Sequence, residues 1–103
     1  MHESERRRSR RFPLKQPAFV RPLEGEETLS AETQDVSKDG VLLLAEKLLP
    51  VGMRTELVLV LESRLERSIR LSGTCQVVRV QEEQPQGRYA IAFRCDQPFA
   101  LMD

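Results

Sequence analysis

The sequence predicts an all-β fold: one domain built as a small six-stranded antiparallel β-barrel. Three observations lead to this prediction. Short apolar segments recur along the chain, many of them alternate with polar residues, and Gly, Pro, Asp or Ser bounds each segment. At 103 residues the chain has room for one modest core. Closing the sheet into a barrel removes free strand edges, which would otherwise pair with other chains.

Six segments are expected to form the strands: 18–22, 28–36, 41–45, 55–62, 68–81 and 88–95. Side chains two residues apart share one side of a strand. This rule assigns to the core a set in each of the last two strands: Ile69, Leu71, Gly73, Cys75 and Val77, then Tyr89, Ile91, Phe93 and Cys95. Residues 57–61 are apolar on both faces, which is typical of a central strand or of one covered by another element or a partner.

The connections between these segments contain the residues that tight turns use. Lys38-Asp39-Gly40, Pro50-Val51-Gly52 and Pro85-Gln86-Gly87 each end in glycine, which adopts a positive φ at little cost. After the last strand, Asp96-Gln97-Pro98 resembles a helix start, with Asp96 as N-cap and proline in the first turn. We therefore expect hairpin connections and at most a short C-terminal helix.

The charge of the chain is unevenly distributed although its net charge is zero. Residues 1–23 carry seven Lys or Arg against two Glu, a charge of +5, which leaves −5 on residues 24–103. We divide the chain into a flexible basic arm, 1–12, and a barrel, 13–103, and expect an anionic partner at the arm. An arm with this much charge cannot bury enough apolar surface to hold itself in place, so we expect it to be mobile until it closes over that partner.

The sequence shows no membrane-spanning or secretory segment. Its longest apolar runs are far shorter than the roughly 20 residues that span a bilayer. The first 20 residues contain no apolar stretch like that of a signal peptide, so we expect a cytoplasmic protein without membrane insertion. Cys75 and Cys95 stand in no C-x-x-C arrangement and His2 is the sole histidine, which argues against a zinc site. We interpret the cysteines as small apolar strand residues, with an opportunistic disulfide as the alternative.

Two short motifs carry the functional argument. Arg7-Arg8-Ser9-Arg10-Arg11 has the form R-x-x-x-R, and Asp35-Val36-Ser37-Lys38-Asp39-Gly40 has the form D-x-S-x-x-G. Each has a plain structural interpretation when taken alone: a solvated basic tail in the first case and a hairpin turn in the second. Taken together, in this order and on a β-rich body, they resemble the PilZ domain family. The resemblance covers nearly the whole chain.

The PilZ resemblance implies a six-stranded barrel that binds the bacterial second messenger cyclic di-GMP, with no cofactor. It implies binding roles for Arg7, Arg11, Asp35, Ser37 and Gly40. Such domains usually act as receptors that pass a signal to a downstream effector protein. Three further arginines are secondary candidates: Arg6, Arg8 and Arg10. Arg6 is the one whose extra guanidinium would help to hold a stacked pair of ligand molecules.

The chemistry of these residues suits that ligand. Cyclic di-GMP offers two phosphates and two guanines, and the O6 and N7 acceptors of guanine accept two parallel hydrogen bonds from one guanidinium. A lysine would supply the charge without this planar fork. Asp35 and Ser37, two residues apart, are expected to form one polar patch, where the carboxylate accepts from guanine N1–H and N2–H groups. Gly40 is expected to allow the turn and a close approach of the ligand.

Other functions fit the sequence less well. An enzyme is disfavoured because the chain has no glycine-rich phosphate loop, no histidine near a nucleophile and no identifiable carboxylate pair. The alternative is a small β-barrel that uses its basic arm on nucleic acid or protein without cyclic di-GMP. Stable nucleic-acid binding is not expected, because the body is net acidic and carries few aromatic residues for stacking on bases.

Overall fold

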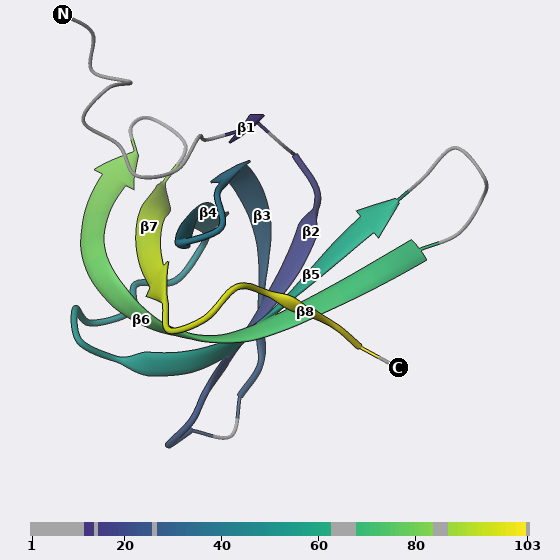
Figure 1. Ribbon diagram of the computed structural model, residues 1–103. Helices are drawn as coiled ribbons and strands as arrows, with labels where there is room; N and C mark the ends of the chain where they lie inside the picture. Colours follow the sequence, from purple (N-terminus) through teal and green to yellow (C-terminus); the bar gives the residue numbers. More distant parts are fainter. Residues whose placement is uncertain (1–11, 14, 26, 63–67, 84–86, 103) are drawn as a thin grey trace, which may run out of the picture.

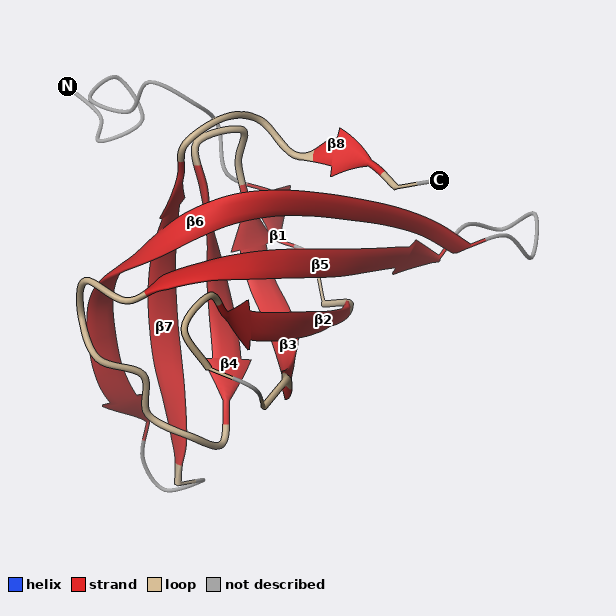
Figure 2. Ribbon diagram, turned by 90° about the horizontal axis from the view of Figure 1, so that it is seen from below, coloured by secondary structure: helices blue, strands red, loops and turns tan. Residues whose placement is uncertain are grey.

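The computed structural model describes residues 12–13, 15–25, 27–62, 68–83 and 87–102, and all regular structure among them is β-strand (Figures 1 and 2). The strands are β1 Phe12–Pro13, β2 Pro17–Pro22, β3 Leu29–Val36, β4 Gly40–Ala45, β5 Arg54–Glu62, β6 Ser68–Glu83, β7 Arg88–Cys95 and β8 Ala100–Leu101. The six longer strands confirm the predicted segments, with ends shifted by two residues at most. Within the described part of the chain, no helix has the length and apolar character needed to cross a membrane.

The six longer strands form a closed antiparallel ring. Their order is β3-β2-β5-β6-β7-β4, and pairing between β3 and β4 closes it. β1 and β2 lie one after the other along the same edge of β3. Between them, the Gln16 amide donates to Thr33 Oγ1 and the Thr33 amide donates to the Gln16 carbonyl, both at 2.8 Å. The barrel predicted from the sequence is therefore confirmed, and β1 and β8 are added outside the ring.

The core lies inside this ring. The alternation of β5 turns Leu57 and Leu59 fully inward. Burial of each such side chain contributes about 1.5–3 kcal/mol to the free energy of folding. The other face of β5 is only partly covered, since Val58 is half-buried and its neighbour Phe19 on β2 is 40% exposed. β5 lies between β2 and β6, as expected of a central strand, but only its inner face is fully buried. The core residues are Ala18, Val20, Val41, Leu43, Ala45, Leu49, Leu57, Leu59, Cys75, Val77, Ile91 and Phe93.

β6 is long enough to serve two partners. Its first half pairs with β5 and its second half with β7, and the register with β7 shifts between Val77 and Arg79. The outer ends of β5 and β6 run side by side past the other strands (Figures 1 and 2). Ile69 lies on this extension and is 42% exposed. Its predicted place in the core is wrong, because the face it shares with Cys75 continues beyond the barrel.

The C-terminal segment forms a strand where the sequence suggested a short helix. The Asp96 amide donates to the Thr74 carbonyl at 3.1 Å, and the Asp96 carboxylate forms an ion pair with Arg54 on β5. Phe99 then packs against the core, and Ala100–Leu101 pairs with β6. The helix prediction is wrong because these contacts with β5 and β6 hold residues 96–97 in a bend and 100–101 in a short strand, whereas an N-cap signal reports only local preference.

Candidate functional site

The 37–40 loop joins β3 to β4 and is held by the hydroxyl of Ser37. The amides of Asp39 and Gly40 donate to Ser37 Oγ at 3.3 and 3.1 Å. The Ser37 amide donates to the Gly40 carbonyl at 2.9 Å. A serine hydroxyl that accepts from amides two and three residues later is typical of a tight polar turn. Ser37 therefore shapes the loop through its side chain as well as lining the cavity described below.

Gly40 has a structural role that differs from the predicted one. Among the described glycines, positive φ occurs at Gly52 (96°) and Gly87 (69°). Gly40 begins β4 opposite Arg94, and a Cβ added to it would lie 2.5 Å from the Phe93 carbonyl oxygen. The expectation that Gly40 supplies a positive φ is wrong. The absence of a side chain is needed because β4 and β7 approach closely at this point.

A row of four residues crosses the outer surface of the barrel beside this loop. Asp35 on β3 is paired with Leu42 on β4, Leu42 with Ala92 on β7, and Ala92 with Arg79 on β6. At the usual strand spacing this row spans roughly 14 Å. A carboxylate thus stands at one end and a guanidinium at the other, with two small or aliphatic residues between them. The Asp35 carboxylate has no hydrogen-bond or ion-pair partner among the residues that the structure describes.

This row is part of a cavity of about 430 Å³, which we call the Asp35 cavity. Its volume lies in the range typical of small-molecule sites. The cavity brings together Asp35, Ser37 and Gly40, as the sequence suggested, and adds the exposed Arg79 and Arg94. The lining residues are Asp35, Ser37, Asp39, Gly40, Val41, Leu42, Val78, Arg79, Ala92, Phe93 and Arg94.

Sequence reasoning missed Arg79 and Arg94 as site residues. The alternation of β7 places Arg94 on the outer face, and that signal was present in the sequence. The position of Arg79 depends on the register shift after Val77, which leaves the exposed Val78 and Arg79 adjacent to the same cavity. No local sequence pattern predicts such a register shift. It becomes visible only in the pairing of β6 with β7.

The arginine motif lies outside the described residues, as do Arg6, Arg7, Arg8, Arg10 and Arg11 as individual candidates. The structure does place the residue that follows the motif. Phe12 pairs with Val36, and Pro13 pairs with Asp35. The chain that leads from Arg11 therefore joins the sheet directly beside the loop and the cavity.

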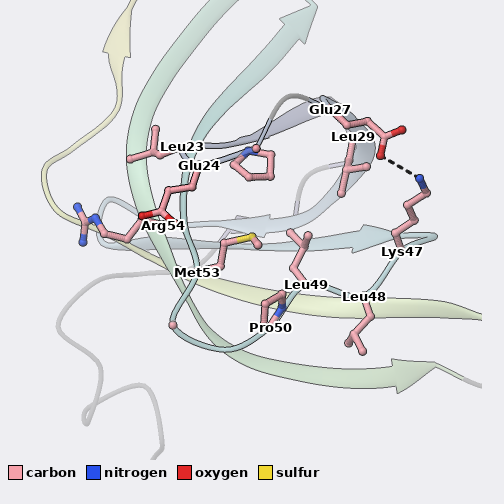
Figure 3. Close-up of a pocket in the computed structure, with 13 residues that line it drawn as sticks. Leu23, Glu24, Glu27, Leu29, Lys47, Leu48, Leu49, Pro50, Met53 and Arg54 are labelled. Atoms are coloured by element: carbon pink, nitrogen blue, oxygen red, sulfur yellow. Dashed lines mark hydrogen bonds and ion pairs between the residues drawn. The ribbon is translucent and has the colours of Figure 1, made fainter.

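A larger groove, of about 830 Å³, lies at the other end of β3 and β4 (Figure 3). Two of its basic residues already have carboxylate partners: Lys47 contacts Glu27 at 3.1 Å, and Arg54 forms an ion pair with Asp96. The rest is chiefly apolar, which suits a dianionic nucleotide poorly. The Asp35 cavity is smaller but combines exposed guanidinium groups with a carboxylate, so its chemistry makes it the stronger candidate. The apolar walls of the groove are Leu23, Leu29, Leu48, Leu49 and Met53.

The two cysteines lie in strands, as expected, and they face each other. Cys75 on β6 pairs with Cys95 on β7, and their sulfur atoms are 2.7 Å apart as free thiols. Cys75 is fully buried in the core, and Cys95 is half-buried against it. Among the residues that the structure describes, no three His, Cys, Asp or Glu side chains gather where they could hold a metal ion.

The comparison with protein families decides the assignment. The family model described as the PilZ domain matches residues 5–99. The chain belongs to the PilZ domain family. The match covers most of the chain, including the arginine run and the 35–40 segment. No protein of curated function matches the sequence.

Solved structures share the PilZ fold with this chain. The inhibitor of motility MotI (DgrA) from Bacillus subtilis superposes with a TM-score of 0.74 at 13% identity, over 89% of this chain and 43% of that protein. The PilZ domain of YcgR from Escherichia coli, solved with c-di-GMP, superposes with a TM-score of 0.67 at 21% identity, over 88% of this chain and 78% of that one. This PilZ chain therefore spans less than half the length of MotI. At these identities the likeness is one of fold.

Proposed function

We propose that this PilZ domain binds cyclic di-GMP between its arginine run and the Asp35 cavity, and so acts as a ligand-switched receptor or adaptor. In this proposal the domain performs no catalysis, and its output is a change in contact with a downstream protein. Membership of the PilZ family and the likeness to a YcgR domain solved with c-di-GMP support the choice of ligand.

One observation carries the proposal: the end of β1 that follows Arg11 pairs with the strand that bears Asp35. Phe12 stands opposite Val36, one residue from Ser37 and one from Asp35. Two motifs that are 23 residues apart in sequence are therefore next to each other where the first one ends. A plain basic tail would need no such connection to the D-x-S-x-x-G loop.

The cavity offers groups for each part of the ligand. The Asp35 carboxylate, which has no partner within the described part of the chain, is an acceptor for the N1–H and N2–H groups of one guanine. Arg79 and Arg94 are donors for a phosphate or for guanine O6 and N7. Leu42 and Ala92 form an apolar floor against which a base can pack. In this proposal, Arg7 and Arg11 supply further guanidinium groups for the phosphates or the guanines.

The test is a calorimetric titration of the full chain with cyclic di-GMP and, in parallel, with cyclic di-AMP. At micromolar protein we expect heat release with the guanine ligand and none with the adenine ligand, because adenine lacks O6 and carries a donor where guanine has that acceptor. Repeating the titration at higher salt should weaken binding without removing this preference. Equal binding of both ligands, with a steep loss in salt, would identify a non-specific polyanion site and overturn the proposal.

A second expected result concerns Arg79. Arg79→Ala should weaken cyclic di-GMP binding by roughly tenfold, as expected for one charged hydrogen bond at an exposed site. The matched control is Arg70→Ala, which removes the same charge from an exposed position of the same strand outside the cavity. That variant should bind within about twofold of the unaltered chain. Equal Kd values for the two variants in calorimetry would exclude Arg79 from the site.

A further inference from the structure

Cys75 and Cys95 occupy a position that favours a covalent bond between them. They are directly opposed on β6 and β7. The backbone hydrogen bond between the two strands lies at the neighbouring residues, where the Asp96 amide donates to the Thr74 carbonyl at 3.1 Å. The cysteines therefore form a non-hydrogen-bonded pair, in which opposed Cα atoms stand about 4.5 Å apart. That separation lies within the range of protein disulfides, so closure needs no large movement of either strand.

The two thiols differ in how a reagent can reach them. Cys75 is fully buried, whereas the half-buried Cys95 lines a shallow cavity with Lys38, Asp39 and Arg94. The hydrogen bond with Cys95 and then burial raise the pKa of the Cys75 thiol, which keeps its proton. A reagent from solvent therefore meets Cys95 first. Lys38 and Arg94 against Asp39 give this cavity an excess of positive charge, and the nearby Asp96 is paired with Arg54, so a reagent with negative charge is favoured.

We propose that Cys75 and Cys95 are a thiol-oxidation site, which closes to a disulfide by exchange with an anionic low-molecular-weight disulfide. The thiolate of Cys95 attacks one sulfur of the reagent, a mixed disulfide forms, and the first reagent thiolate leaves and takes up the proton that Cys95 has lost. The Cys75 sulfur then attacks the Cys95 sulfur. The mixed disulfide breaks, and the second reagent thiolate leaves with the Cys75 proton. The protein loses two electrons and the reagent becomes two thiols.

This site is joined to the 37–40 loop by the backbone. The Cys95 amide donates to the Asp39 carbonyl at 2.8 Å, and the preceding residue, Arg94, pairs with Gly40. Closing the disulfide fixes the strand that carries both contacts. The amide resonances of the loop should therefore shift on oxidation. This expectation holds whether or not the loop binds a nucleotide, so it is independent of the proposed function.

In the test, the full chain is equilibrated in a series of buffers with different ratios of reduced to oxidised glutathione. Free thiols are then blocked, and the mass of the intact protein is measured by mass spectrometry. We expect both thiols to disappear together in the monomer, giving a species lighter by two hydrogen atoms that a dithiol reverses. Cross-linking residues 20 positions apart should raise Tm by about 5 °C or more. Two thiols that stay free at the most oxidising ratio would overturn the proposal. A mixed disulfide that stays open, or a linked dimer, would overturn it too.

Single-cysteine variants separate the two roles. Cys75→Ala should stop at the mixed disulfide on Cys95, because no second thiol can attack it. Cys95→Ala should leave the buried Cys75 unmodified under the same conditions. Modification of Cys75 in the Cys95→Ala variant, with its circular dichroism spectrum unchanged, would contradict the assigned order of attack.

Discussion

Replacing both motif arginines, Arg7→Ala with Arg11→Ala, is expected to weaken cyclic di-GMP binding by at least a hundredfold. Each guanidinium is proposed to donate charge-assisted hydrogen bonds, and each such group contributes about 1.5–3 kcal/mol. The loss should appear in calorimetry as an absence of heat at protein concentrations where the unaltered chain is saturated. Because both positions precede the first strand, the change should leave Tm unaltered.

The same arginine run offers a control of equal charge. Arg8→Ala with Arg10→Ala removes two positive charges and leaves the R-x-x-x-R motif intact. We expect the affinity of this variant to fall by roughly tenfold or less, since Arg8 and Arg10 are proposed only as secondary contacts. Equal losses in the two double variants would mean that the arm acts by charge alone. A third variant, Arg7→Lys with Arg11→Lys, keeps the charge and should still bind poorly, because lysine lacks the planar fork.

Gly40→Ala is expected to lower Tm by roughly 5 to 20 °C, the effect of about 1–3 kcal/mol of overpacking in a domain of this size. The new Cβ would meet the Phe93 carbonyl oxygen at 2.5 Å. That oxygen belongs to the backbone of β7 in the closed ring, so neither group can move without separating β4 from β7. The 37–40 loop should shift as well, since Gly40 donates to Ser37 Oγ. Binding measured below the lowered Tm should be weaker.

Gly73→Ala is the matched control for this prediction. Its Cβ would lie 2.9 Å from Phe99 Cδ1, a clash of similar depth with a side chain rather than with backbone. The Phe99 side chain belongs to the C-terminal segment, and its ring can rotate away from the new Cβ. We therefore expect a clearly smaller fall in Tm. Calorimetric melting of the two variants decides the matter. Equal falls would show that the approach of β4 to β7 is not the cause.

The strands were predictable because their signals are local. Apolar runs bounded by Gly, Pro, Asp and Ser locate the six longer strands, and the 35–40 segment is compact in sequence, so its three motif residues fall around one cavity. The predictions that proved wrong concern features that depend on residues distant in the sequence. Ile69 is exposed because β5 and β6 extend past the core, and the expected helix is replaced because the chain around Asp96 pairs with Arg54 and Thr74.

The candidate site shows the same division. Asp35, Ser37 and Gly40 follow from one contiguous motif. The guanidinium of Arg79 lies at the cavity because the register between β6 and β7 shifts after Val77, and the spacing of residues in the sequence does not predict this shift. The role of Gly40 also depends on a carbonyl from another strand, at Phe93. Roles of the arginine run remain a prediction from the motif and the family.

The two-residue pairing of β1 with β3 acts as a tether. Arg11 directly precedes Phe12, whose backbone pairs with Val36, so the arginine run is covalently linked to a strand that lies beside the Asp35 cavity. A short tether of this kind gives an effective concentration on the order of millimolar. The same arginine run added as a free peptide at micromolar amounts would therefore fail to replace it in trans. In the proposed complex, the arginine run would therefore cost less binding entropy than a separate third partner, because it is covalently attached to β1.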